Sequence, residues 1–259
     1  MTFKRLIKTV VPNSMHLPLL YTYFKITGRL DDEISLISDH VRNCRRAIDV
    51  GANIGKYSYA LSKYFDCVDA FEPNIECSKM LRAYASKKNN VTVHNVGLSN
   101  NTGDVTLYVP FLKGKAGLDV GLASITDPGG DCKRLTISLQ RLDDFNFKNV
   151  DFIKIDVEGH EYEVLEGAIE TIRREKPILL VEIEQRHLKG RSINNIFHFI
   201  TSFGYTGGYF KKKIFYSIET FSYERHQKPY LNNFFSNQYI NNFIFAPIAQ
   251  DVVNRSELS

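Results

Sequence analysis

The chain has 259 residues, of which 43% are hydrophobic and 24% are charged, and its net charge is +4. This length can bury a sizeable core in one α/β domain with a short extension, and the composition is that of an ordinary globular protein. The basic residues are scattered, so a nucleic-acid partner is not indicated. The four cysteines are irregularly spaced, which indicates neither a disulfide framework nor a zinc site and favours a cytoplasmic protein. No apolar run approaches the ~20 residues of a membrane span, and the basic N-terminus lacks a secretory core.

The first part of the chain differs in pattern from the rest. We predict an N-terminal helical extension over residues 1–43, whose leucines and aromatic residues pack on a main domain over residues 44–259. A basic amphipathic anchor on a membrane surface is the alternative reading of this extension. The main domain should carry an insertion at about residues 100–140, where the regular alternation of elements lapses.

Residues 47–58 predict a short buried strand, a glycine-rich turn and the first turn of a helix. Gly51 and Gly55 lack a Cβ where the backbone must bend sharply and lie close to a ligand. The unpaired N–H groups of the new helix point to the same place. The next strand ends at Glu72, about 23 positions after Asp49, which suits an acid that binds ribose hydroxyls.

The residues of this turn distinguish between two nucleotide cofactors. Asn53 stands where a dinucleotide-binding G-x-G-x-x-G turn would have its second glycine, and Asp49 lies two residues before the first. An acid at this point would repel a pyrophosphate, but it favours an amino group such as that of S-adenosylmethionine. We therefore predict S-adenosylmethionine as the cofactor and disfavour an NAD-dependent oxidoreductase. Asn95, at the end of the third strand, is a less certain contact.

Strands and helices alternate from residue 46 to about 184. The expected strands lie at 67–71, 91–96, from 151, and at 178–184, and the expected helices at 55–65, around 77–84, at 160–175 and at 192–203, with two final strands near 209–217 and 240–246. This alternation predicts an α/β fold with a mostly parallel, doubly wound sheet. Two half-exposed strands, 104–109 and 135–139, fall in the insertion, which should hang beside the cofactor side of the sheet and could cover a substrate.

Acidic residues follow the ends of the expected parallel strands, where ligands bind in open α/β sheets. Asp156 and Glu158 follow the fourth strand. We predict that Asp156 faces the methyl group of the cofactor, with capping of the next helix as the alternative role for both acids. His160 is predicted to take a proton from the acceptor, because an imidazole titrates near neutral pH. A helix-capping role is its alternative, and His187 is a weaker candidate.

A divalent cation is a further hypothesis for the same edge. Asp156, Glu182 and Glu184 could converge on a metal ion that polarises the acceptor oxygen, although nothing in their spacing requires it.

A set of segments, in order between about residues 45 and 247, also carries a family resemblance. They are Asp49-Val-Gly-Ala-Asn-Ile-Gly-Lys-Tyr-Ser58, Phe71-Glu-Pro73, Leu142-Asp-Asp-Phe145, Asp151-Phe-Ile-Lys-Ile-Asp-Val-Glu-Gly-His-Glu161, Leu165-Glu-Gly-Ala168, Leu180-Val-Glu182 and Asn242-Phe-Ile-Phe-Ala-Pro247. These segments resemble the FkbM family of S-adenosylmethionine-dependent methyltransferases. One departure is Gly97, where the family pattern leads us to expect alanine.

The resemblance implies a class I, Rossmann-like methyltransferase fold and O-methylation of hydroxyls on sugars or natural products. Bacterial members are often associated with surface-polysaccharide synthesis. Carried over by position, the cofactor set is Asp49, Gly51, Asn53, Gly55 and Glu72, with Asn95 less certain, while Asp156, Glu158 and His160 fall on the acceptor side. The alternatives are a non-catalytic module that binds the S-adenosyl group or a nucleotide, and a nucleic-acid methyltransferase.

Overall fold

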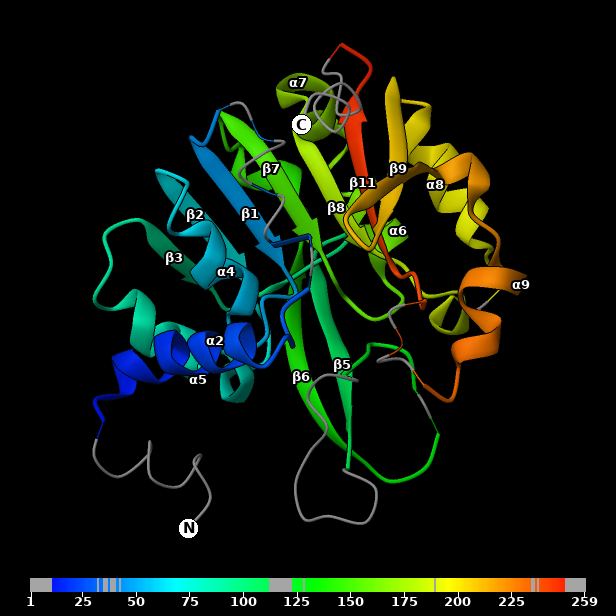
Figure 1. Cartoon of the computed structure of the whole chain (residues 1–259). Helices are drawn as coiled ribbons and strands as arrows, with labels where there is room; N and C mark the ends of the chain where they lie inside the picture. Colours follow the sequence, from blue (N-terminus) through cyan, green and yellow to red (C-terminus); the bar gives the residue numbers. More distant parts are fainter. Residues whose placement is uncertain are drawn as a thin grey trace.

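In the computed structural model, the described residues are 11–31, 33–34, 37, 41, 43–111, 123–127, 129–188, 190–233, 236 and 238–249. The main sheet has eight strands in the order β10-β9-β11-β8-β7-β1-β2-β3 (Figure 1). Their bounds are β1 Arg46–Val50, β2 Cys67–Phe71, β3 Val91–His94, β7 Val150–Ile155, β8 Ile178–Glu182, β9 Tyr205–Lys211, β10 Ile214–Ser217 and β11 Asn242–Pro247. The five strands from β3 to β8 are parallel, and β11 runs antiparallel to both β8 and β9. The mostly parallel sheet predicted from the sequence is confirmed.

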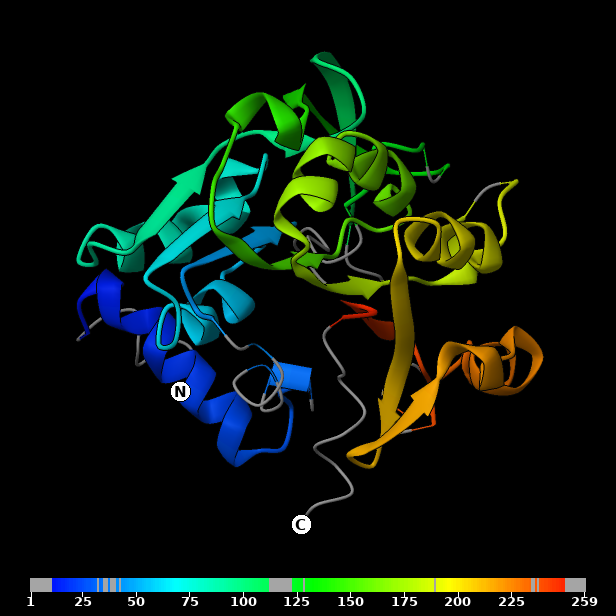
Figure 2. The same ribbon diagram turned by 90° about the horizontal axis from the view of Figure 1, so that it is seen from above.

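Helices cover both faces of this sheet. The helices α2, α4 and α5 lie on one face and α6, α7 and α8 on the other (Figure 2). Their bounds are α2 His16–Ile26, α4 Lys56–Leu61, α5 Ile75–Ala85, α6 Glu161–Glu166, α7 Ile169–Glu175 and α8 Ile193–Thr201, and a short α9 spans Tyr223–His226. Along β8, Leu179 and Val181 pack into the core beneath α6–α8, whereas Ile178 and Leu180 pack into the opposite core. Burial on both faces explains why this strand reads as a continuous apolar run.

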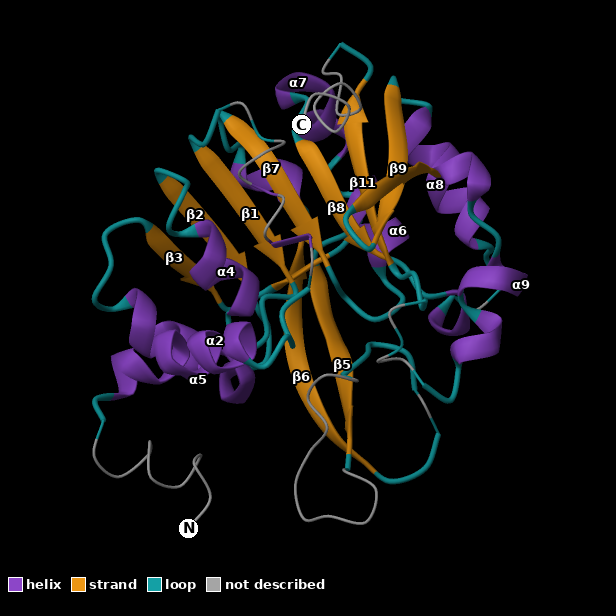
Figure 3. Cartoon of the chain, viewed as in Figure 1, coloured by secondary structure: helices purple, strands orange, loops and turns teal. Residues whose placement is uncertain are grey.

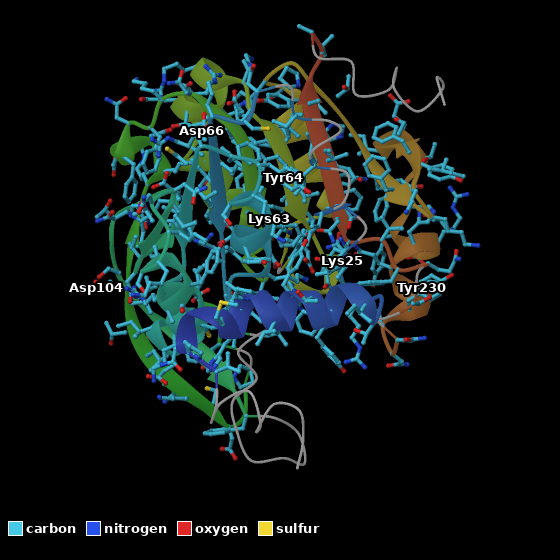
Figure 4. The ribbon with its side chains drawn as sticks, turned by 60° about the vertical axis from the view of Figure 1, so that its left-hand side comes forward. Lys25, Lys63, Tyr64, Asp66, Asp104 and Tyr230 are labelled. Atoms are coloured by element: carbon cyan, nitrogen blue, oxygen red, sulfur yellow. The ribbon has the colours of Figure 1, made fainter. Side chains whose placement is uncertain are left out.

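Helix α2 packs against the start of the main domain. The rings of Tyr21 on α2 and Tyr59 on α4 have centroids 4.8 Å apart. The ammonium of Lys63 lies 4.7 Å from the first centroid and 4.1 Å from the second. Figure 4 shows Lys63 close to α2, which carries Lys25. A domain boundary at residue 43 stays a prediction.

The single helix expected over residues 160–175 is instead two helices, α6 and α7. At Gly167, between them, a Cβ would lie 1.9 Å from the backbone oxygen of Ser99, so this close approach requires glycine. The carboxylate of Asp143 then accepts hydrogen bonds from two backbone N–H groups in the first turn of α7. This contact from a distant part of the chain ends one helix and starts the next.

The strand expected near residues 209–217 is also two elements. β9 and β10 form an antiparallel hairpin, and Lys212 and Lys213 form its turn in the left-handed conformation. This turn was not predicted from the sequence, because its residues are lysines and not the glycine or asparagine that usually adopts such a conformation.

The insertion forms a second, three-stranded sheet in the order β4-β6-β5. Its strands are β4 Gly97–Leu98, β5 Gly103–Pro110 and β6 Cys132–Gln140. β5 and β6 project beyond the carboxyl ends of the main strands (Figure 3). Residues 112–122, within the expected insertion, lie outside the described residues. Within the described ranges, none of the helices has the length and apolar character needed to cross a bilayer.

Candidate active site

A cleft of about 710 Å³ lies at the carboxyl edge of the main sheet. Its floor comes from the ends of β1, β2, β7 and β8, and one wall is largely apolar and comes from the insertion. The wall residues are Leu107, Ala123, Ser124, Ile125, Ile137 and Leu139. Ligands of open α/β sheets bind at this edge, so the insertion covers the expected ligand site.

The glycine turn forms one end of the cleft. Gly51 has a φ of +79°, and a Cβ there would lie 1.8 Å from the backbone oxygen of Asp156. Asn53 is left-handed as well, with a φ of +49°. Gly51 and Asn53 both line the cleft. Gly55, at the start of α4, does not, because its bare Cα packs against Leu81 and Leu17.

Glu72 lines the cleft beside this turn. Its Oε2 accepts a hydrogen bond of 2.9 Å from the backbone N–H of Asn53, and its Oε1 accepts one of 2.8 Å from that of Asn74. Burial raises the pKa of Glu72 to about 7, although both hydrogen bonds act to lower it. The carboxyl group is therefore held by two loops at the place predicted for the ribose.

Asp49 does not line the main cleft. Its Oδ2 accepts a hydrogen bond of 2.5 Å from the hydroxyl of Ser58, and burial raises its pKa to about 6. It lines a smaller cavity of about 210 Å³, together with Phe24 of α2, Tyr57 and Lys154 among others. The two cavities share Gly51, Asn53, Lys56 and Asp156 as lining residues. Asp49 therefore lies behind the glycine turn, and its contact with the cofactor stays a prediction.

Asn95 is not among the residues that line either cavity. Its Oδ1 accepts a hydrogen bond from Arg82, and its Nδ2 donates one of 2.7 Å to the backbone oxygen of Pro73. The side chain therefore braces the turn after β2. Its contact with the cofactor stays a prediction.

A buried cation lies beneath the other end of the cleft. The ammonium of Lys154 is fully buried, 3.9 Å from Oδ2 of Asp156 and 3.7 Å from Oε2 of Glu182. Burial acts to lower its pKa, but these carboxylates outweigh that effect and raise it. Sequence reasoning assigned Lys154 no role, although a lone charge inside an apolar strand was the available signal. It also missed Asn241 and Asn242, which reach the cleft because β11 starts at this edge.

Glu158 and His160 line the same end of the cleft. Oε2 of Glu158 lies 2.8 Å from Nδ1 of His187. The ring of His160 is engaged on both sides, with Nε2 2.9 Å from the hydroxyl of Ser99 and Nδ1 3.4 Å from Oε2 of Glu163. Burial lowers the pKa of His160. Its role as a base stays a prediction.

The three carboxylates considered for a metal ion do not converge. Glu184 accepts hydrogen bonds from Tyr239 and Arg186, and it does not line the cleft. Across the described residues, no group of three His, Cys, Asp or Glu side chains could hold a metal ion. The guanidinium of Arg186 and the phenol of Tyr239 both bind Oε2 of Glu184.

Comparison with known proteins supports the family resemblance. The sequence model of the methyltransferase FkbM domain matches residues 49–206. The chain belongs to the FkbM methyltransferase family. Methyltransferase sdnD of Sordaria araneosa is 30% identical over 155 residues, which cover 48% of this chain and 60% of that protein. The methyltransferase FkbM structure from Methylobacillus flagellatus KT aligns with a TM-score of 0.50 at 20% identity, over 94% of this chain and 57% of its own, and shows the shared fold.

Membership of the FkbM methyltransferase family supports the predicted cofactor, S-adenosylmethionine. The residues fit this group: Gly51 and Asn53 let the backbone approach closely, Glu72 presents a buried carboxyl, and no pyrophosphate-binding turn is present in this described segment. This FkbM-family chain spans 60% of the length of methyltransferase sdnD and 57% of the length of the protein in the Methylobacillus flagellatus structure. Its activity and substrate are therefore proposals.

We expect Glu72→Ala to weaken binding of S-adenosylhomocysteine about ten- to hundredfold, because the ribose loses its carboxyl hydrogen-bond acceptor, worth about 1.5–3 kcal/mol. Isothermal calorimetry would measure the dissociation constant. Glu76→Ala, which removes an exposed acid four positions along the chain, should leave that constant unchanged. Equal affinities in wild type and Glu72→Ala would place the ribose elsewhere.

Proposed function

We propose that this chain transfers the methyl group of S-adenosylmethionine to a hydroxyl oxygen of a neutral sugar, glycan or natural-product acceptor. The observation that carries the proposal is that a single cleft is lined both by the glycine turn with Glu72 and by four polar side chains at or just after the ends of β7 and β8. These side chains belong to Asp156, Glu158, His160 and Glu182. Surface-polysaccharide synthesis is the biological setting that the family suggests for such an activity.

Methyl transfer to a hydroxyl requires the protein to align the cofactor with the acceptor, to exclude water and to remove one proton. When bound, S-adenosylmethionine supplies an electrophilic methyl group on a sulfonium. The apolar wall from the insertion excludes water, and Ser124 from that insertion donates a hydrogen bond of 3.4 Å to the backbone oxygen of Glu158. Asp156, Glu158 and His160 are the proposed groups around the acceptor hydroxyl, which must lose its proton as the new bond forms.

The charge of the cleft supports a neutral acceptor. Carboxyl groups outnumber lysine and arginine side chains among its lining residues, and one of those cations, Lys56, lies 2.7 Å from the carboxylate of Asp31. This environment offers no excess of positive charge for a polyanion such as nucleic acid. The planar polar side chains of Asn241 and Asn242 suit hydroxyl groups.

The experiment combines binding with transfer, on the full chain. Calorimetry should detect S-adenosylmethionine and S-adenosylhomocysteine but not NAD. Tritium from methyl-labelled S-adenosylmethionine should then pass to at least one member of a panel of monosaccharides, methyl glycosides, sugar nucleotides and hydroxylated natural products. Binding without transfer to any member would favour the non-catalytic alternative. Transfer to RNA or DNA alone would favour the nucleic-acid alternative, and binding of NAD alone would overturn the cofactor.

A further inference from the structure

Glu158 is held in an unusual backbone conformation at the acceptor end of the cleft. Its φ is +53°, and that of Gly159 is +98°. A left-handed conformation is unfavourable for glutamate and persists only where the surrounding structure imposes it, as it often does at functional sites. The result is a carboxyl group that lines the cleft two residues beyond Asp156.

The turn after β8 packs against this segment and holds it in place. A Cβ at Gly159 would lie 2.7 Å from the backbone oxygen of His187, so the two loops touch at this point. His187 ends a short 3₁₀ turn over Gln185–His187, and its Nδ1 lies 2.8 Å from Oε2 of Glu158. His187 does not itself line the cleft. The imidazole therefore stands behind the carboxyl group and can fix one oxygen while the other remains for a ligand.

The other candidate proton acceptors are engaged differently. His160 would have to give up Ser99 or Glu163 to bind a proton from the acceptor. Asp156 and Glu182 share the buried ammonium of Lys154, which attracts one carboxylate oxygen of each. Only Glu158, among these groups, combines a place in the cleft, an imposed backbone conformation and an imidazole partner.

We propose that Glu158 is the proton acceptor of the methyl transfer and that His187 is its positioning residue. The inference rests on the proposed function. As the bond between the acceptor oxygen and the methyl carbon forms, the carbon–sulfur bond breaks and its electron pair stays on sulfur. The acceptor proton passes to Oε1 of Glu158 and later to water. His187 donates from Nδ1 to Oε2, which orients the carboxylate and favours its charged form.

The pKa of Glu158 fits this role. Burial raises it, and Asp156 and Glu184 raise it further, whereas the hydrogen bond and the charge of His187 act to lower it. A proton acceptor with a raised pKa is a stronger base, provided that it is ionised at the working pH. Turnover should therefore rise with pH as Glu158 ionises. Removal of His187 should raise the pKa of Glu158 further.

The test uses the full chain and the member of the acceptor panel that receives tritium fastest. Glu158→Gln should lower kcat about 10²–10⁴-fold and leave the affinity for S-adenosylhomocysteine unchanged. His187→Leu should lower kcat and move the acid limb of the pH–kcat profile to higher pH by about one unit. His187→Asn should keep both kcat and the acid limb of the pH–kcat profile close to those of the wild type, because the asparagine Nδ2 can donate from nearly the position of Nδ1.

A matched control is available in the same fold. Nε2 of His94 lies 2.8 Å from Asp69, and the His94 side chain is 21% exposed, against 20% for that of His187. This pair lines neither cavity. His94→Leu should therefore change the melting temperature without moving the pH profile.

The outcomes separate this inference from the proposed function. If the wild-type chain transfers tritium to no panel member, both the proposed function and the present inference are wrong. Transfer by wild type together with equal transfer by Glu158→Gln overturns only the present inference. An unmoved pH profile in His187→Leu, or a profile moved equally in His94→Leu, removes the role of His187. A large loss of kcat in His160→Gln with normal turnover in Glu158→Gln would assign the proton to His160.

Discussion

Gly51→Ala should abolish measurable binding of S-adenosylhomocysteine and lower the melting temperature more than any other single change considered. The added Cβ would lie 1.8 Å from the backbone oxygen of Asp156 and 2.9 Å from its carbonyl carbon. Neither atom can move alone, because the N–H of Asp156 donates to the backbone oxygen of Val50. The ends of β1 and β7 must therefore separate, which displaces both the turn and Asp156.

The control for this change is Gly204→Ala. Gly204 has the same φ of +79°, but a Cβ there would meet nothing within 4 Å. Both variants bear the cost of a left-handed alanine, about 1–2 kcal/mol, and only Gly51→Ala adds the clash. We expect Gly51→Ala to melt about 6 °C or more below Gly204→Ala, which should bind S-adenosylhomocysteine normally. Scanning calorimetry and binding calorimetry measure both quantities, and equal behaviour of the two variants would contradict the close approach.

Lys154→Met should lower the free energy of unfolding by about 3 kcal/mol. The ammonium is fully buried and near two carboxylates, so its loss leaves Asp156 and Glu182 close together without a counter-charge. Methionine fills a similar volume and cannot provide that charge. Urea denaturation, with the slope compared between variants, measures the difference.

The charge explanation can be separated from a packing explanation. Glu182→Gln in the Lys154→Met background removes one of the two unpaired carboxylates, so the double variant should be more stable than Lys154→Met alone. Lys228→Met removes the exposed partner of Glu224 and should barely change stability. A double variant no more stable than Lys154→Met would mean that the lost contact of the ammonium with the Tyr57 ring, and not repulsion between the two carboxylates, accounts for the loss.

The fold class followed from periodic patterns that act within short segments. Buried parallel strands read as apolar runs, and the intervening helices read as apolar stripes, so the order of strands and helices was predictable. The errors came from contacts between distant segments. Ser99 and Asp143, far from Gly167 in the chain, divide the expected helix over residues 160–175 in two.

The candidate site also combines features that were predictable from the sequence with features that were not. The glycine turn and the place of Glu72 beside it were predictable, because a tight turn after a buried strand requires particular residue types at a fixed spacing. Binding of the ribose by Glu72 stays a prediction. The side chains that surround each acid were not predictable from the sequence. Glu184 has the same type and nearly the same position as Glu182, yet Tyr239 and Arg186 hold it outside the cleft.

Sequence by itself therefore determined the kind of cofactor site and the edge of the sheet on which it lies, because short motifs fix the backbone locally. The tertiary structure decided which acids face the cleft, and it did so through partners remote in the chain. Lys154 lies near Glu182 only because β7 and β8 pair. His187 reaches Glu158 only because the loops after those two strands touch at Gly159. The charge and orientation of a carboxyl group depend on such neighbours, and no pattern within one segment encodes them.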